Sequence, residues 1–231
     1  MKTLGVIGGL GPESTVDYYE RIIRVYRERT SDGSYPRIII NSLNLQQMVG
    51  FAEAGDWSSV ASYLIDAFEQ LARAGAEFGL ISANTPHVVF DDVRKASSIP
   101  LISIVEATCE AAQKRGMKKL GLFGTRFTMQ GRFYPEVFSR AGISLAVPNS
   151  EEQAYIHEHY MGELVKGVFR DETRQRFVDI ADALKERDGI DGLILGGTEL
   201  PLILKESDMQ GLPLLDTTQI HVEAAVDGLL A

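Results

Sequence analysis

Cysteine is almost absent from this sequence, because Cys109 is the single cysteine among 231 residues. One thiol excludes an internal disulfide and a metal cluster held by several thiolates. The residues around it, IVEATCEAAQ, are typical of the interior of a helix, so we expect a buried structural thiol.

Clustered positive charge and long apolar runs are also missing. The sequence has 23 lysines and arginines against 32 aspartates and glutamates, a net charge of −9. Without a basic cluster to neutralise phosphates, neither nucleic acid nor an anionic membrane is an expected partner. No apolar run is long enough to cross a bilayer, and the approach to the first apolar segment is too short for a secretory signal. We therefore expect a cytoplasmic protein, with enough apolar residues, 45%, to build an ordinary core.

Histidine, a frequent metal ligand, occurs only four times. His157 and His159 are two positions apart on a predicted helix and so point to different faces, which argues against a metal site. His87 follows a candidate loop, where it can act as an acid or base or pack at the start of a helix. We expect His221 to cap or pack.

The sequence does contain an internal repeat. KTLGVIGG, from Lys2, matches KKLGLFGT, from Lys118, and IPLIS at Ile99 matches LPLLD at Leu212. Between these pairs, AGAEFGLISANTP matches DGIDGLILGGTELP. Three matches in the same order and at nearly one spacing predict two copies of one α/β unit, far longer than the repeats of solenoids.

Helical patterns fill the spaces between the short apolar strands. Apolar residues recur at helical spacing in three sets: Val16, Tyr19, Ile23 and Tyr26; Val60, Leu64, Phe68 and Leu71; and Phe177, Ile180 and Leu184. This alternation predicts an α/β fold of parallel sheets covered on both faces. We expect two pseudo-symmetric, doubly wound domains, residues 1–98 with 214–231 and residues 99–213, with a ligand cleft between their strand ends.

The first loop that could carry chemistry is GGLGPEST, after the first predicted strand. It does not match the dinucleotide-binding fingerprint, which needs a third glycine where the residues after Gly11 are proline, glutamate and serine. The loop is typical of a helix start, with Pro12 in the first turn and Ser14 or Thr15 as N-cap. Its amides, Gly9 included, can hold a small anion.

Three further loops follow predicted strands: ISANTPH, GTRFTMQG and GGTELPL. In the second of them, Thr125 and Thr128 either bind an anion or only cap a helix. Because all four loops offer hydroxyl or amide donors, together they suit a small anion such as an amino-acid carboxylate.

These motifs, in this order along nearly the whole chain, resemble the aspartate/glutamate racemase family. The matching segments are GGLGPEST, NTPH from Asn84, GTRFTM and GTELPL from Gly197. The resemblance implies two pseudo-symmetric α/β domains, usually a homodimer, and cofactor-independent inversion at the α-carbon of an acidic amino acid. No cofactor is therefore expected.

Inversion needs a base on each side of the α-carbon, and family members typically use two cysteines. One stands immediately before the Asn-Thr of the first motif, where some members have threonine, and the other immediately before the Thr-Glu of the second. Here these positions are Ala83 and Gly197, which cannot move a proton. If the chemistry has moved, its carriers are Glu199, His87, Ser82, Thr85 or Thr198. Glu199 is the strongest of these, because burial beside a ligand can raise a carboxyl pKa towards neutrality.

The resemblance also assigns substrate-binding residues. It places the α-carboxylate and amino group against Asn84, Thr85, Thr125, Thr128 and Thr198. Lys166, in ELVKG, falls where aspartate racemases have a lysine for the distal carboxylate. Their arginine after the second strand has no counterpart in the segment NLQQM, so specificity for aspartate is not implied.

Three functions remain open from the sequence. The first is an amino-acid racemase or related isomerase with an altered base pair. The second is a non-catalytic protein that binds a small carboxylate or an amino acid, and the third is a carbon–carbon lyase or sugar isomerase on the same scaffold.

Overall fold

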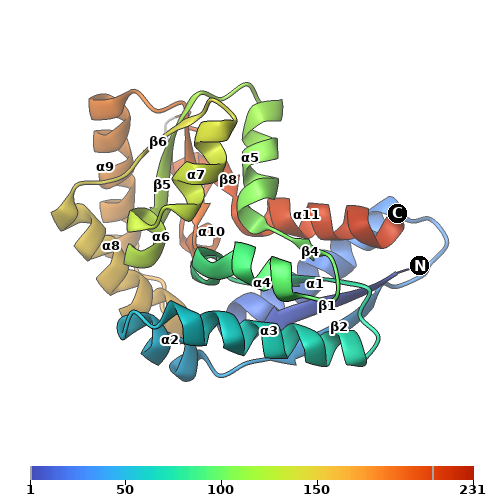
Figure 1. The fold of residues 1–231 in the computed structure, drawn as a ribbon. Helices are drawn as coiled ribbons and strands as arrows, with labels where there is room; N and C mark the ends of the chain where they lie inside the picture. Colours follow the sequence, from blue (N-terminus) through green and yellow to red (C-terminus); the bar gives the residue numbers. More distant parts are fainter. Residues whose placement is uncertain (1, 210) are drawn as a thin grey trace. The chain divides into compact units, whose positions relative to one another are not determined.

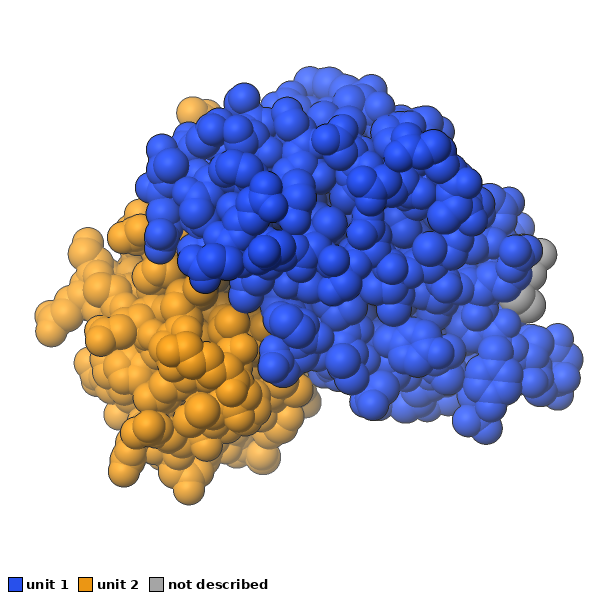
Figure 2. Space-filling view, turned by 90° about the horizontal axis from the view of Figure 1, so that it is seen from below, with its two compact units in different colours: residues 1–107, 218–231 blue, residues 108–217 orange. Residues whose placement is uncertain are grey.

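The computed structural model describes residues 2–209 and 211–231, which form two compact units (Figures 1 and 2). The first unit runs up to Ala107 and also includes Thr218–Ala231, and the second comprises Thr108–Thr217. The domain boundaries expected from the repeat, 98/99 and 213/214, stay a prediction.

The first unit is built on a parallel sheet with strand order β2-β1-β3-β4. Its strands are β1 (Thr3–Gly8), β2 (Arg37–Ser42), β3 (Phe78–Ile81) and β4 (Leu101–Ile102). The helices of this unit are α1 (Pro12–Arg29), α2 (Leu45–Glu53), α3 (Trp57–Arg73), the short η1 (Thr85–Val89), α4 (Phe90–Ala96) and α11 (Thr217–Leu230). Helix α5 (Ile104–Lys114) begins in this unit and continues into the second.

The second unit repeats this arrangement, with parallel strand order β6-β5-β7-β8. Its strands are β5 (Lys119–Gly124), β6 (Ser144–Ala146), β7 (Gly192–Gly196) and β8 (Leu214–Asp216). Its helices are α6 (Arg126–Gln130), α7 (Phe133–Arg140), α8 (Ser150–Gly162), η2 (Leu164–Lys166), α9 (Asp171–Asp188), α10 (Leu200–Ile203) and η3 (Glu206–Asp208).

The expected fold class is confirmed. The three matched sequence pairs are the strand pairs β1 and β5, β3 and β7, and β4 and β8, and each set takes the same places in its own sheet. In the first sheet, Leu4 and Val6 pack with α1 and α11, whereas Ile7 packs on the other side with α3. Both faces of the sheet are therefore apolar, as expected for a parallel sheet between helices.

The C-terminal helix α11 completes the first unit. It contributes Val222, Ala225, Val226 and Leu229 to the core that also contains Tyr18 and Ile22 of α1. In Figure 1 the red helix α11 consequently lies beside the blue helix α1, although they are at opposite ends of the sequence.

Two expectations about side chains are tested by burial. Cys109 is buried within α5, as predicted, and this burial raises the pKa of its thiol. The helix over Val16–Tyr26 is also confirmed, but the apolar residues that predicted it are not all buried, since Val16 is 59% and Tyr19 47% exposed. The helix packs through Tyr18, Ile22, Val25 and Tyr26, which also recur at helical spacing.

Candidate functional site

The loop after β1 is closed by its own hydrogen bonds. The amide of Gly9 donates to Thr15 Oγ1 at 2.8 Å, and the Thr15 hydroxyl donates to the carbonyl of Gly11 at 3.1 Å. The expectation that Ser14 or Thr15 caps the helix was wrong, because α1 begins at Pro12 with Gly11 as its N-cap. An anion bound to the Gly9 amide would have to displace the bond to Thr15.

Gly9 is required by the close approach of another loop. It has φ +78°, and a β-carbon there would lie 2.2 Å from the carbonyl oxygen of Leu43. Only glycine allows the chain after β2 to cross at this distance. The structure thus accounts for Gly9 by packing, and its role in substrate binding stays a prediction.

The loop after β3 contains Ala83, Asn84, Thr85 and His87, all in the first unit. Ala83, Asn84 and His87 are buried, and Thr85 begins η1. His87 Nδ1 lies 3.0 Å from the carbonyl oxygen of Ala83, and the amide of Ile104 donates to His87 Nε2 at 3.2 Å. Since a carbonyl only accepts, the proton of the neutral ring is on Nδ1.

A second buried histidine, His221 of α11, is held in the same way. Its Nε2 donates to the carbonyl of Ile102 at 3.1 Å, and its Nδ1 accepts from the Tyr18 hydroxyl at 2.9 Å. Burial lowers the pKa of His221 to about 4. Burial, and then the neighbouring His221, lower the pKa of His87 to about 3. Both rings are neutral near pH 7 with both nitrogens engaged, which supports packing over acid–base roles.

The loop after β5 brings Thr125 and Thr128 together. Thr125 is the N-cap of the short helix α6, and its hydroxyl oxygen accepts from the amide of Thr128 at 3.3 Å. The two hydroxyls are also 3.3 Å apart and buried. The capping alternative is therefore observed, and a substrate contact by either residue stays a prediction. Lys166, at the end of η2, is exposed.

The loop after β7 holds a buried carboxyl group. The Thr198 hydroxyl donates to Glu199 Oε2 at 2.9 Å, and the Tyr160 hydroxyl of α8 donates to the same oxygen. All three residues are at most 5% exposed. Burial, and then the charge of Glu199, raise the pKa of Tyr160 well above its ordinary value.

Tyr160 also explains the glycine at position 197. A β-carbon on Gly197 would lie 2.5 Å from Tyr160 Cε2 and 2.8 Å from its hydroxyl oxygen. The ring therefore fills the space that a side chain at position 197 would need. Tyr160 is not predictable as a site residue from the sequence, because nothing in the pattern of α8 links it to a loop 37 residues later along the chain.

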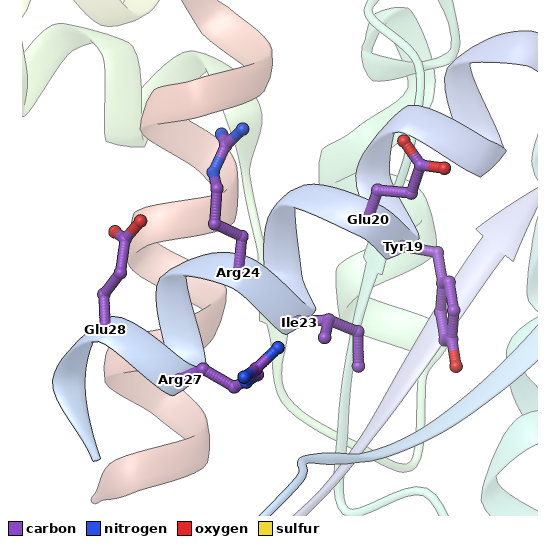
Figure 3. Close-up of a pocket in the computed structure, with 6 residues that line it drawn as sticks. All are labelled: Tyr19, Glu20, Ile23, Arg24, Arg27 and Glu28. Carbon is purple, nitrogen blue, oxygen red and sulfur yellow. The ribbon is translucent and has the colours of Figure 1, made fainter. Parts of the chain in front are cut away.

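The outer face of α1 is hollowed along residues 19–28. A groove of about 540 Å³ is lined by Tyr19, Glu20, Ile23, Arg24, Arg27 and Glu28 (Figure 3). None of these residues lies at the carboxyl end of a strand, where ligands bind in open α/β sheets.

The described part of the chain contains no group of three or more histidine, cysteine or acidic side chains placed to hold a metal ion. Within residues 2–209 and 211–231, none of the helices combines the length and apolar character that a membrane span requires.

The two parallel sheets of identical strand order, each with polar loops at its carboxyl edge, define a class of α/β proteins with two repeated units. Within this class, the chain belongs to the Asp/Glu/Hydantoin racemase family, whose model matches residues 7–225. The family resemblance drawn from the motifs is thus confirmed.

Three relatives show the extent of the similarity. An aspartate racemase homologue from Pyrococcus horikoshii OT3 is 37% identical with a TM-score of 0.86, and all of both chains is covered. A candidate Asp/Glu racemase from Yersinia pestis is 33% identical with a TM-score of 0.91, again over all of both chains. The broad specificity amino-acid racemase RacX from Bacillus subtilis (strain 168) is 24% identical over 99% of this chain and 98% of its own.

Proposed function

We propose that this protein is a cofactor-independent enzyme with chemistry of the amino-acid racemase type, which removes and returns the α-proton of a small amino acid or a related carboxylate. The observation that carries the proposal is that strands β3 and β7, which correspond in the repeat, both end in buried polar residues. Asn84 follows β3, and Thr198 with Glu199 follows β7. Because this chain belongs to a racemase family, these loops are the natural place for the substrate.

The acid–base pair of such an enzyme is altered here. By resemblance, Ala83 and Gly197 stand where relatives carry cysteines, and neither side chain ionises. Glu199 lies two residues after Gly197 and accepts two hydrogen bonds from side chains, so its carboxyl is held in one position. We assign the proton transfer of the second unit to this loop, because a positioned carboxyl group can serve as a general acid or base.

The alternative is a protein that binds an amino acid or small carboxylate without converting it. Two observations favour it: position 83 carries no ionisable group, and the neighbouring His87 has both ring nitrogens engaged. The two functions share the binding loops and differ only in whether the α-proton moves.

The binding loops are tested by the double variant Thr85→Val/Thr198→Val. A hydrogen bond to a charged group contributes about 1.5–3 kcal/mol, so loss of one contact weakens binding by roughly 10- to 150-fold. The measurement is thermal stabilisation by each proteinogenic amino acid in its L and D forms, followed by calorimetric titration of the tightest binder. Thr173→Val, a buried threonine of α9, is the control for loss of a buried hydroxyl. Equal affinity of the native protein and the double variant would place the substrate elsewhere.

We also propose that the protein forms a homodimer through the outer face of α1. Val16 and Tyr19 are exposed apolar residues on this face, and acidic and basic side chains follow along the same helix. In a two-fold, antiparallel contact centred between Ile23 and Arg24, Glu20 of each copy meets Arg27 of the other. A self-complementary surface of this kind suits an isologous dimer.

A further inference from the structure

We propose that Tyr160 and Glu199 together form the acid–base group of the second unit, and that the protein transfers the α-proton of its substrate on one side only. It then exchanges this proton with solvent and retains the configuration at the α-carbon. The inference rests on the proposed function, because it concerns the same substrate and the same loop.

The position of the Tyr160 hydroxyl carries the first step. This oxygen lies 2.8 Å from the point where a β-carbon on Gly197 would stand. By resemblance, position 197 is where relatives carry a catalytic side chain, so α8 delivers a proton-carrying group to the place that the loop itself has left empty. Gly197 and Tyr160 are therefore one arrangement, since any larger residue at 197 would push the ring away.

Glu199 makes this tyrosine able to act. A lone buried phenol is a poor base at neutral pH because it keeps its proton. Here the hydroxyl already donates to Glu199 Oε2, so the phenol can pass its proton to the carboxylate as it accepts another. Thr198 donates to the same oxygen at 2.9 Å, which restricts the position of the carboxyl group.

The proton transfer balances without any further reactant. The α-carbon–hydrogen bond breaks, the proton moves to Tyr160 Oη, and the tyrosine proton moves to Glu199. The electron pair left on the α-carbon is delocalised into the substrate carboxylate. The protons now on Tyr160 and Glu199 then exchange with solvent. Reversal of both transfers returns a solvent proton to the same face of the α-carbon.

The first unit has no matching group in the described loop after β3. Ala83 has no ionisable side chain, and the Ser82 hydroxyl donates to the carbonyl of Ile7 at 2.9 Å. His87 holds its Nδ1 proton against the carbonyl of Ala83 and accepts at Nε2. Helix α2, which takes the place of α8 in the order of elements, carries Phe51 and no tyrosine. With a group on one side alone, inversion has no second proton donor.

The experiment follows the α-proton signal by NMR in D₂O, for each proteinogenic amino acid in its L and D forms. Chiral chromatography of the same samples measures inversion. We expect deuterium to enter one or more substrates while the opposite enantiomer does not accumulate. Inversion at the rate of exchange would overturn the one-sided mechanism.

The variants Tyr160→Phe and Glu199→Gln test the two residues. Each should lower kcat for exchange by about 10²- to 10⁴-fold, the usual contribution of a positioned acid–base group, with KM changed little. Tyr134→Phe is the matched control, because Tyr134 is also a fully buried tyrosine of the second unit, and it should keep exchange within a few-fold. Circular dichroism checks the fold, and Glu199→Gln decides if Tyr160→Phe does not fold.

The outcomes separate this inference from the function on which it rests. The inference is overturned if an amino acid stabilises the protein without any exchange, or if exchange survives in Tyr160→Phe and Glu199→Gln. In both cases the proposed binding site still stands. No binding of any amino acid overturns the proposed function as well.

Discussion

Gly197 is a small residue with a large neighbour. It is not among the glycines with positive φ, so its backbone accepts other residues, and the ring of Tyr160 is what excludes them. That ring is buried and hydrogen-bonded to Glu199, so it cannot swing away without leaving a buried carboxyl short of a donor.

This packing determines how a cysteine pair can be restored. We expect Ala83→Cys/Gly197→Cys to be overpacked and destabilised by about 1–3 kcal/mol, because the new side chain at 197 meets the Tyr160 ring. Adding Tyr160→Ala should make room and permit inversion of an amino acid that the protein binds. The measurements are urea unfolding for stability and chiral chromatography for inversion. The stability lost on adding the two cysteines should be smaller in the Tyr160→Ala background than in the native protein, and equal losses would contradict the steric account.

At the scale of elements, two histidines tie helices to the first sheet. His221 joins α11 to Tyr18 of α1 and to the carbonyl of Ile102 in β4. His87 joins the loop after β3 to the amide of Ile104 at the start of α5. Each ring is neutral and accepts one hydrogen bond at its unprotonated nitrogen. Protonation of that nitrogen would place its N–H against a group that already donates to it.

The neutral histidines make stability depend on pH. Their pKa values fall to about 3 and about 4 in the folded protein, so below pH 6.5 the unfolded chain binds more protons. Stability is therefore full above about pH 6.5 and declines as the pH falls towards 4. At pH 4.5 we expect a loss of about 3 kcal/mol for each histidine.

Urea unfolding of His221→Gln between pH 8 and 4.5 checks this expectation. The variant should be less stable at neutral pH, because glutamine does not reproduce both bonds, and it should lose less stability on acidification than the native protein. An unchanged pH dependence would assign the acid sensitivity to other groups.

Helix α1 carries two apolar stripes, and only one of them is buried. Val16, Tyr19 and Ile23 follow helical spacing as well as Tyr18, Ile22 and Val25 do, because aromatic and aliphatic residues occur on both sides of this helix. Periodicity can identify a helix from such a sequence, but it cannot decide which of two apolar stripes meets the sheet.

For the whole molecule, the exposed stripe on α1 predicts association. We expect the variant Tyr19→Glu to dissociate the proposed homodimer, because in this register the new carboxylate of each copy would be buried against Glu28 of the other. Phe169→Glu, at a similarly exposed aromatic residue of the second unit, is the control and should leave the mass unchanged. Sedimentation at several concentrations gives the mass. A native protein that is monomeric at all concentrations would contradict the dimer.

The repeat, the α/β class and the family are all readable from the order of residues, because each rests on local patterns. The stretch Leu193–Leu195 is an apolar run typical of a buried strand, and the loop after it carries its glycine, threonine and proline within a few positions. The absence of an ionisable side chain at Ala83 was equally plain from the order of residues.

The surroundings of these positions, in contrast, depend on how the chain folds. Tyr160 fills the space beside Gly197 and donates to Glu199, although α8 and β7 are separated in sequence by all of α9. The engagement of both nitrogens of His87 likewise depends on Ile104, seventeen positions away. Periodicity and motifs report neighbours along the chain, whereas the chemistry of a buried side chain depends on atoms that folding brings to it from elsewhere.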